Sequence, residues 1–162
     1  MAKTSKTSLL DAGLRLLGEQ GSRRFTLRAV EDEAEVTHGT IRHHFGDYEA
    51  FLAACVDHLL LADFPGTSET PEKSVARWLG PQRMLTRARY ELALMSTRDK
   101  LLSQKFVAAR DTISTMIEAS SDLSREDAHA AMAALDGLIF DALLRDEPGV
   151  DPAPLLRRFG LA

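Results

Sequence analysis

The sequence of 162 residues predicts an all-α fold, on three observations. Apolar residues recur at spacings of three and four along most of the chain, which is the pattern of amphipathic helices. Hydrophobic residues make up 44% of the chain but aromatic residues only 6%, a balance that disfavours a sheet. No segment alternates apolar and polar residues as a half-buried strand does. We therefore expect roughly eight or nine helices around a sizeable core.

The first helix carries an apolar stripe formed by Leu9, Leu10, Leu14 and Leu17. Gly21 follows this stripe and is expected to end the helix as its C-terminal cap. Phe25 stands alone among polar residues, so we expect it to anchor this region in a small core. Thr26 can accept a hydrogen bond from a free backbone N–H, which predicts a second helix over residues 26–34.

The third and fourth helices are each expected to begin at a capping side chain. Thr37 is the predicted cap of a helix over residues 37–45, which Gly46 ends. Asp47 is the predicted cap of the next helix. The apolar side of that fourth helix comprises Phe51, Leu52, Cys55, Val56, Leu59 and Leu60. Cys55 is the only cysteine, so no disulfide can form within the chain, and we expect it to be a small apolar core residue.

The second part of the chain begins at a loop, Pro65-Gly66-Thr67-Ser68. Thr70-Pro71-Glu72 has the cap, proline and acid of a helix start, and that helix should stop at Gly80. Two amphipathic helices follow, and Ser124 predicts the start of another by a capping box. That helix, residues 128–144, is apolar nearly all round, so it needs cover on several sides. We expect a second subunit to bury part of this helix. The alternative is that the helix is buried wholly within its own subunit. A last short helix is expected over residues 152–159.

Charge is distributed unevenly, although the net charge is only −4. Residues 1–30 carry six basic and two acidic side chains, whereas residues 31–60 carry one basic and seven acidic side chains. This balance excludes a protein that coats nucleic acid by charge alone, but it permits a DNA-binding protein with a local basic face. No run of 18 apolar residues and no signal peptide is readable, and cysteine is scarce. We therefore expect a cytoplasmic protein without membrane contact.

The helices over residues 26–34 and 37–45 are spaced like a helix-turn-helix, in which the second helix enters the major groove of DNA. Gly39 and Thr40 are small enough for close approach, while Ile41 and Phe45 could hold the helix to the core. The spacing alone fits a plain helical bundle equally well.

Several short motifs within residues 9–52 narrow this choice. They are Leu10-Asp11-Ala12, Gln20-Gly21, Phe25-Thr26-Leu27-Arg28, Val36-Thr37-His38-Gly39-Thr40-Ile41, His44-Phe45 and Glu49-Ala50. Together they resemble the DNA-binding domain of the TetR family of bacterial transcriptional regulators. The resemblance implies a homodimer with a helix-turn-helix domain at residues 1–48 and a helical ligand-binding and dimerisation core at residues 49–162. Most such proteins are repressors that a small molecule releases from an operator in double-stranded DNA.

The resemblance also implies which residues meet DNA. They are Thr26, Arg28, Thr37, His38, Thr40, Arg42, His43, His44 and Tyr48. Thr26, Arg28 and Arg42, with a basic arm containing Lys3 and Lys6, are expected to contact phosphates. His38, Thr40 and His43 are expected to contact bases.

Four positions depart from the family pattern. Glu31 replaces a small residue between the two helices, and Glu35 replaces a glycine of the turn, where a positive φ would be strained. Arg42 replaces a tyrosine, and Tyr48 replaces a lysine that contacts phosphate. If Glu31 and its acidic neighbours faced DNA, they would repel its phosphates.

The second part of the chain offers weaker signals. A ligand pocket is expected among Trp78, Met95, Phe106, Met116 and His129, because methionines and aromatic residues suit an adaptable apolar cavity. The expected dimer interface comprises Met132, Leu135, Ile139 and Leu143. For both sets, ordinary core packing is the alternative interpretation.

Other functional classes find little support in the sequence. Adjacent histidines on a helix diverge by about 100°, so a metal site at His38, His43 and His44 is not expected. We expect neither a cofactor nor an enzyme, since no nucleophile motif or glycine-rich phosphate loop is present. The alternative function is a helical protein-interaction module whose headpiece no longer binds DNA. It gains weight if the acidic residues 31–35 dominate the exposed face.

Overall fold

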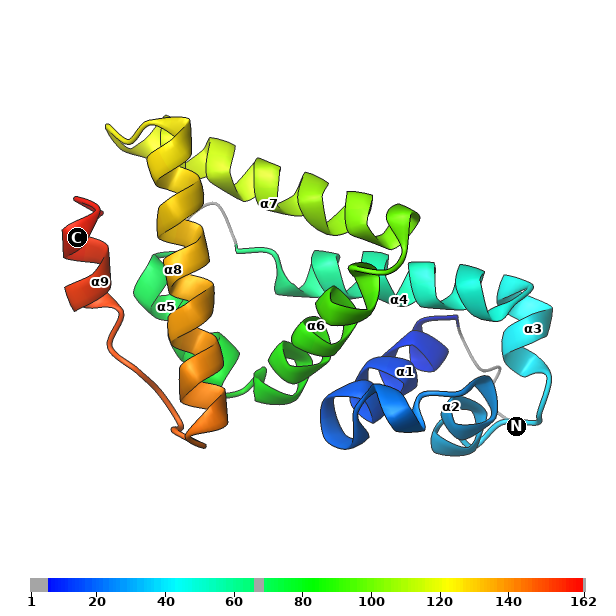
Figure 1. The fold of residues 1–162 in the computed structure, drawn as a ribbon. Helices are drawn as coiled ribbons and strands as arrows, with labels where there is room; N and C mark the ends of the chain where they lie inside the picture. The colour runs from blue at the N-terminus through cyan, green and yellow to red at the C-terminus, as the bar shows by residue number, and fades with distance from the viewer. Residues whose placement is uncertain (1–5, 66–68, 162) are drawn as a thin grey trace. The chain divides into compact units, whose positions relative to one another are not determined.

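The computed structural model describes residues 6–65 and 69–161, so Lys3 and the expected loop residues 66–68 lie outside the described residues. Over the described ranges the chain is helical and contains no strand, which confirms the predicted class. It divides into two compact units, which are drawn in Figure 1. Unit 1 consists of residues 1–64 and 84–106, and unit 2 of residues 65–83 and 107–162. In these described ranges no helix is both long enough and apolar enough to cross a bilayer.

The helices fall into the two units as follows. Unit 1 contains α1 (Lys6–Gln20), the 3-10 helix η1 (Ser22–Arg24), α2 (Leu27–Glu33), α3 (Thr40–Phe45), α4 (Tyr48–Asp63), most of α6 (Arg83–Ser96) and the start of α7 (Lys100–Ser120). Unit 2 contains α5 (Pro71–Leu79), the remainder of α7, α8 (Arg125–Leu144) and α9 (Ala153–Arg158).

The core of unit 1 is built where α1 packs on α2 and α4, and α4 packs on α3. Phe25 is buried and stacks on Phe51 at 6.1 Å between ring centroids, as its isolated position predicts. Gly21 ends α1 with φ 77°, and its N–H donates to Leu17 O at 3.0 Å, which confirms the predicted cap. The expected division after residue 48 falls at the start of α4. The expected helix-turn-helix domain, residues 1–48 (the headpiece), therefore shares this core with α4.

Helix starts that depend on a local side chain are predicted correctly. In each case the side chain accepts a hydrogen bond from the backbone N–H three residues later, which satisfies one free donor of the first turn. These N-caps are Thr26, Asp47, Thr70 and Ser124. The helix starts that they cap, at α2, α4, α5 and α8, are therefore specified within a few residues of sequence.

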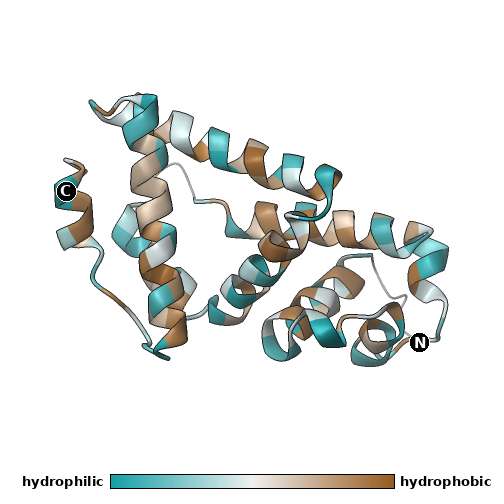
Figure 2. Cartoon of the chain, viewed as in Figure 1, coloured by the Kyte–Doolittle hydropathy of each residue, from teal (hydrophilic) through white to brown (hydrophobic). Residues whose placement is uncertain are grey.

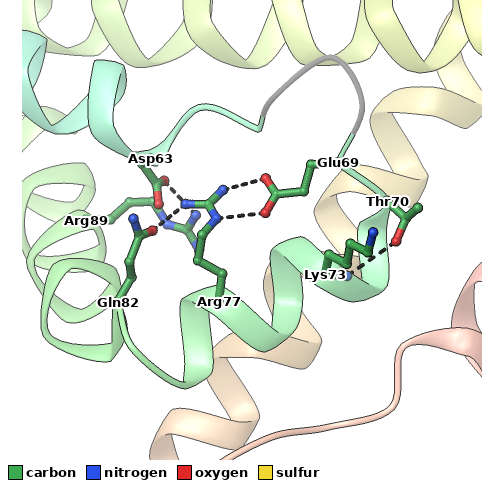
Figure 3. A network of polar contacts seen from close by, with 7 residues as sticks. All are labelled: Asp63, Glu69, Thr70, Lys73, Arg77, Gln82 and Arg89. Carbon is green, nitrogen blue, oxygen red and sulfur yellow. Dashed lines mark hydrogen bonds and ion pairs between the residues drawn. The ribbon is translucent and has the colours of Figure 1, made fainter.

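Each unit also contains an arginine paired with a shielded carboxylate (Figure 3). In unit 1, Arg89 donates to Asp63 at 2.8 Å. In unit 2, Arg77 donates from Nε and Nη2 to both oxygens of Glu69, each at 2.8 Å, and from Nη1 to Gln82. The two-pronged contact is the geometry in which guanidinium and carboxylate bind most strongly. It holds Glu69, two residues before α5, against that helix.

The long apolar helix, α8, has one buried and one exposed face. Ala128, Met132, Ile139 and Ala142 are buried in the chain. Apolar residues nevertheless recur along the helix (Figure 2), and Phe140 and Leu144 remain 46% and 69% exposed. With the exposed Ala133 and Gly137, they follow the spacing 133, 137, 140, 144, which is a single helix face. We name these four residues the α8 stripe.

Candidate functional site

The two helices of the predicted helix-turn-helix, α2 and α3, pack on one another in unit 1 (Figure 1). The predicted start of α3 at Thr37 is wrong, because the helix begins at Thr40 with Gly39 as its N-cap. Gly39 has φ 93°, a left-handed conformation that suits glycine and adds residues to the turn. The hydroxyl and the N–H of Thr40 both donate to Thr37 O, at 2.5 and 3.2 Å. As a result α3 has only six residues.

The turn between α2 and α3 has a left-handed backbone conformation at Glu35, the position where the family pattern has glycine. Glu35 has φ 54°, one of two positive values at non-glycine positions among the described residues. Such a conformation costs a side-chain-bearing residue about 1 kcal/mol or more. The next residue closes the turn, since the Val36 N–H donates to Glu31 O at 3.0 Å.

All nine residues expected at DNA lie in this part of unit 1, between the N-cap of α2 and the first residue of α4. The exposed ones are Thr26, Arg28, Thr37, His38, Arg42 and His43, and the half-buried ones are Thr40, His44 and Tyr48. Ile41 is fully buried, and Phe45 packs edge-on against Phe51 at 5.1 Å between centroids. These two contacts hold α3 to the core, as the sequence predicts.

The acidic run that follows Val30 is engaged by other residues of unit 1. Glu31 is only 3% exposed, and its Oε1 accepts from the N–H groups of Gly39 and Ile41 at 3.0 and 2.9 Å. Asp32 accepts from His38 at 2.7 Å. Glu33 pairs with Arg15 of α1 at 2.9 Å. Glu31 therefore does not meet the condition for repelling phosphates, because its carboxylate points inward.

Basic side chains remain available beside these engaged acids. Arg23 and Arg24 of η1, Arg28 of α2 and Arg42 of α3 are all exposed. Among the described residues, none of the four has an ion-pair partner. Exposed arginines that are not paired within the protein are suited to phosphate oxygens. This arrangement favours a DNA-binding headpiece over one dominated by acidic groups.

The histidines of this region make separate contacts. His38 uses Nε2 on Asp32, which leaves Nδ1 for a further hydrogen bond. His43 and His44 meet edge-on with ring centroids 5.2 Å apart, and His44 also contacts Phe45. Over residues 6–65 and 69–161, no three potential ligand side chains gather to hold a metal ion.

Tyr48 and Cys55 are both kept in their neutral forms by their surroundings. Burial is the main cause that raises the pKa of Tyr48, whose ring lies 6.0 Å from that of Phe25. Its hydroxyl, at the first turn of α4, can therefore offer a phosphate only a neutral hydrogen bond. Burial also raises the pKa of the Cys55 thiol far above its usual range, as befits an unreactive core residue.

The candidate pocket residues are divided between the units. Met95 and Phe106 pack against the core of unit 1. Trp78, Met116 and His129 belong to unit 2, where Trp78 is 8% exposed and His129 Nε2 lies 3.6 Å from Asp111. Within unit 1, Met95 and Phe106 therefore contribute to core packing.

The candidate dimer residues lie mostly on the inner side of α8. Met132 and Ile139 are 8% and 0% exposed within the chain itself, and Leu135 and Leu143 are half-buried. A partner helix can reach the α8 stripe more readily, since Phe140 and Leu144 are exposed.

Comparison with known proteins matches both parts of the chain. Residues 9–55 match the family model of bacterial regulatory proteins of the tetR family. Residues 67–160 match the model of a tetracyclin repressor-like C-terminal domain. Among curated relatives, the HTH-type transcriptional regulator BetI of Burkholderia thailandensis is 35% identical over 60 residues, which is 37% of this chain and 31% of the relative. BetI of Brucella anthropi is 30% identical over 82 residues, which is 47% of this chain and 42% of the relative. The matches thus span less than half of those relatives' lengths.

Solved structures of similar fold cover nearly the whole chain. A TetR family member from Streptomyces coelicolor A3 has a TM-score of 0.76 at 25% identity, over 96% of this chain and 95% of that one. The multidrug binding protein EbrR complexed with ethidium has a TM-score of 0.74 at 24% identity, over 99% and 98% of the two chains.

Proposed function

The chain belongs to the TetR family of bacterial regulatory proteins, and we propose that it is a dimeric, ligand-responsive transcriptional repressor. In this proposal it acts in the cytoplasm on a near-palindromic operator. Two headpieces contact successive major grooves about 34–36 Å apart. Arg28 and Arg42 bind phosphates, while His38, Thr40 and His43 contact bases. The observation that carries the proposal is that Arg28 and Arg42 are exposed and lack an ion-pair partner among the described residues, while the neighbouring acids Glu31, Asp32 and Glu33 are engaged within unit 1.

DNA binding is tested by the anisotropy of a labelled duplex that spans the region upstream of the protein's own gene. We expect tighter binding to this duplex than to a random duplex of equal length, and weaker binding to both as salt increases. The slope against salt estimates the number of phosphate contacts, at about 0.9 per contact. If a folded dimer selects no duplex from this region or from a randomised pool, the regulator proposal fails and the interaction-module hypothesis replaces it.

We propose that the C-terminal part, residues 67–160, holds the small-molecule effector and the dimer contact. The match of this part to a tetracyclin repressor-like C-terminal domain supports the assignment. The relative EbrR is described as a multidrug binding protein and was solved with ethidium. Trp78, Met116 and His129 are the candidate effector residues of unit 2. Release from the operator on addition of an aromatic cation in the anisotropy assay would support this part of the proposal.

The dimer is proposed to form through the α8 stripe rather than through Leu135, which lies on the opposite side of the helix among its buried residues. Leu144→Asp would place a charge in an apolar contact between copies, so we expect this variant to sediment as a monomer with unchanged helix content. Leu61→Asp is the matched control, because Leu61 is 81% exposed on α4 of unit 1. Sedimentation velocity distinguishes the two. A Leu144→Asp variant that remains dimeric at micromolar concentration would contradict the proposed interface.

A further inference from the structure

The buried carboxylate of Glu31 occupies an unusual place between the two helices of the headpiece. It comes from the middle of α2, yet its Oε1 accepts from the N–H groups of Gly39 and Ile41, at 3.0 and 2.9 Å. These two donors lie on either side of the first residue of α3, Thr40. The N-cap of α3 is a glycine with no side-chain hydrogen bond of its own. Glu31 thus does from a neighbouring helix what a capping side chain usually does from within the chain segment.

The contact is strong for physical reasons. The first N–H groups of a helix have no partner within it, and they carry the positive end of the helix dipole. A carboxylate that accepts from them makes charge-assisted hydrogen bonds. With only 3% of Glu31 exposed, water cannot readily replace these bonds. The short helix α3 therefore depends on α2 for the satisfaction of its N-terminus.

A second contact joins the same two segments. His38, in the turn just before α3, donates to Asp32 of α2 at 2.7 Å. Consecutive acidic residues of α2 therefore hold the residues that enter α3, one inside the unit and one on its surface. This arrangement connects the helix that carries Arg28 to the helix that carries Thr40, Arg42 and His43.

We propose that Glu31 is a positioning residue for DNA recognition. This inference rests on the proposed function. It fixes the start of α3 relative to α2, so that base contacts from α3 and the phosphate contact from Arg28 can form together. Recognition sites of this kind require supporting contacts that hold each group to within about 0.5 Å. The proposal opposes the simple electrostatic expectation, in which removal of any carboxylate near DNA strengthens binding.

Three variants separate positioning from charge. Glu31→Ala removes the acceptor, and the family pattern has a small residue here, so the fold is expected to tolerate it. Glu31→Gln removes the charge but keeps an oxygen acceptor of the same reach. Glu33→Ala is the matched control, since it removes the same charge from the same helix but only breaks a partly exposed pair with Arg15. The probe is a duplex that the unmodified protein selects from a randomised pool.

We expect Glu31→Ala to bind the selected duplex about tenfold more weakly, because the buried N–H of Ile41 and the partly buried N–H of Gly39 lose their acceptor. Glu31→Gln should remain within about threefold of the unmodified protein, and Glu33→Ala should bind as tightly or more tightly. Binding by Glu31→Ala that equals or exceeds that of Glu33→Ala would overturn the proposal.

A measurement without DNA keeps the inference separate from the proposed function. Amide hydrogen exchange in the free protein should accelerate at Gly39 and Ile41 in Glu31→Ala, relative to Glu31→Gln, while exchange at Leu17 in α1 is unchanged. If the unmodified protein selects no duplex but this acceleration is seen, the proposed function fails and the link between α2 and α3 stands. Equal exchange at Gly39 and Ile41 in all variants would overturn the link itself.

Discussion

Replacement of Arg28 and Arg42 together by alanine is expected to weaken DNA binding about a hundredfold, on the operator and on random duplex alike. Both side chains are exposed and lack an ion-pair partner among the described residues, so their charges are available to phosphates. Phosphate contacts carry no sequence information, which is why the loss should be uniform. Because the proposed dimer presents two copies of each arginine, the slope of log affinity against log salt should fall by about 3.6, at 0.9 per lost contact.

Two comparisons make this expectation specific. Alanine at Arg125 and Arg157, exposed arginines of unit 2, changes the net charge equally but should leave DNA affinity within about twofold. His38→Ala should instead alter the preference between duplexes, because His38 is assigned to a base. Competition titrations with a panel of single-base operator variants provide this measurement. If the double arginine variant and His38→Ala lose equal affinity on every duplex, the division into phosphate and base contacts is refuted.

Gly18→Ala is expected to destabilise the protein by about 2–3 kcal/mol, although alanine normally stabilises a helix interior. Gly18 lies in α1, and a Cβ built there would come within 2.2 Å of the backbone oxygen of Met84 and 2.9 Å of its Cγ. A backbone carbonyl cannot move aside as a flexible side chain can, so α1 and α6 must separate. The melting temperature followed by circular dichroism should fall by roughly 5–10 °C.

Gly137→Ala provides the opposite expectation in another helix interior. A Cβ at Gly137 of α8 would meet no atom within 4 Å, so helix propensity alone predicts stabilisation of up to about 1 kcal/mol. Both substitutions are best compared in the Leu144→Asp background, where the α8 stripe is not expected to contact a partner. Changes in stability of the same sign for the two glycines would show that close packing at Gly18 is not what selects glycine there.

Features that depend on neighbouring residues could be predicted from the sequence. Thr26, Asp47, Thr70 and Ser124 each cap an N–H three residues ahead, so the chemistry and its partner lie in one short segment. Gly21 needs only its own positive φ and a carbonyl four residues back. The apolar periodicity of α1 and α4 likewise indicates which side becomes buried. These local rules predict the order of the helices, whereas the identification of residues 1–48 as a DNA-binding domain depends on the motifs that resemble the TetR family.

Features that depend on distant partners could not be predicted in this way. The cap of α3 comes from Glu31, eight and ten residues before the N–H groups it binds, so Thr37 seemed the natural cap. For the same reason, the sequence alone does not show whether the acidic side chains of residues 31–35 face DNA or are engaged within the protein. On α8, apolar residues occur nearly all round the helix, so their spacing does not show which face packs within the same subunit. In the structure α8 packs on α5 and α9, with Ile139 buried and Leu144 exposed.

The chain's chromophores are sorted between its two units. The only tryptophan, Trp78, is 8% exposed in unit 2, with the guanidinium of Arg77 5.4 Å from its ring centroid. Both tyrosines, Tyr48 and Tyr90, belong to unit 1. Intrinsic tryptophan emission therefore reports on the surroundings of a single residue of unit 2, whereas far-ultraviolet dichroism follows the helices of both units. A comparison of the two signals in the unmodified protein therefore tests whether unit 1 and unit 2 unfold in one cooperative step or in two.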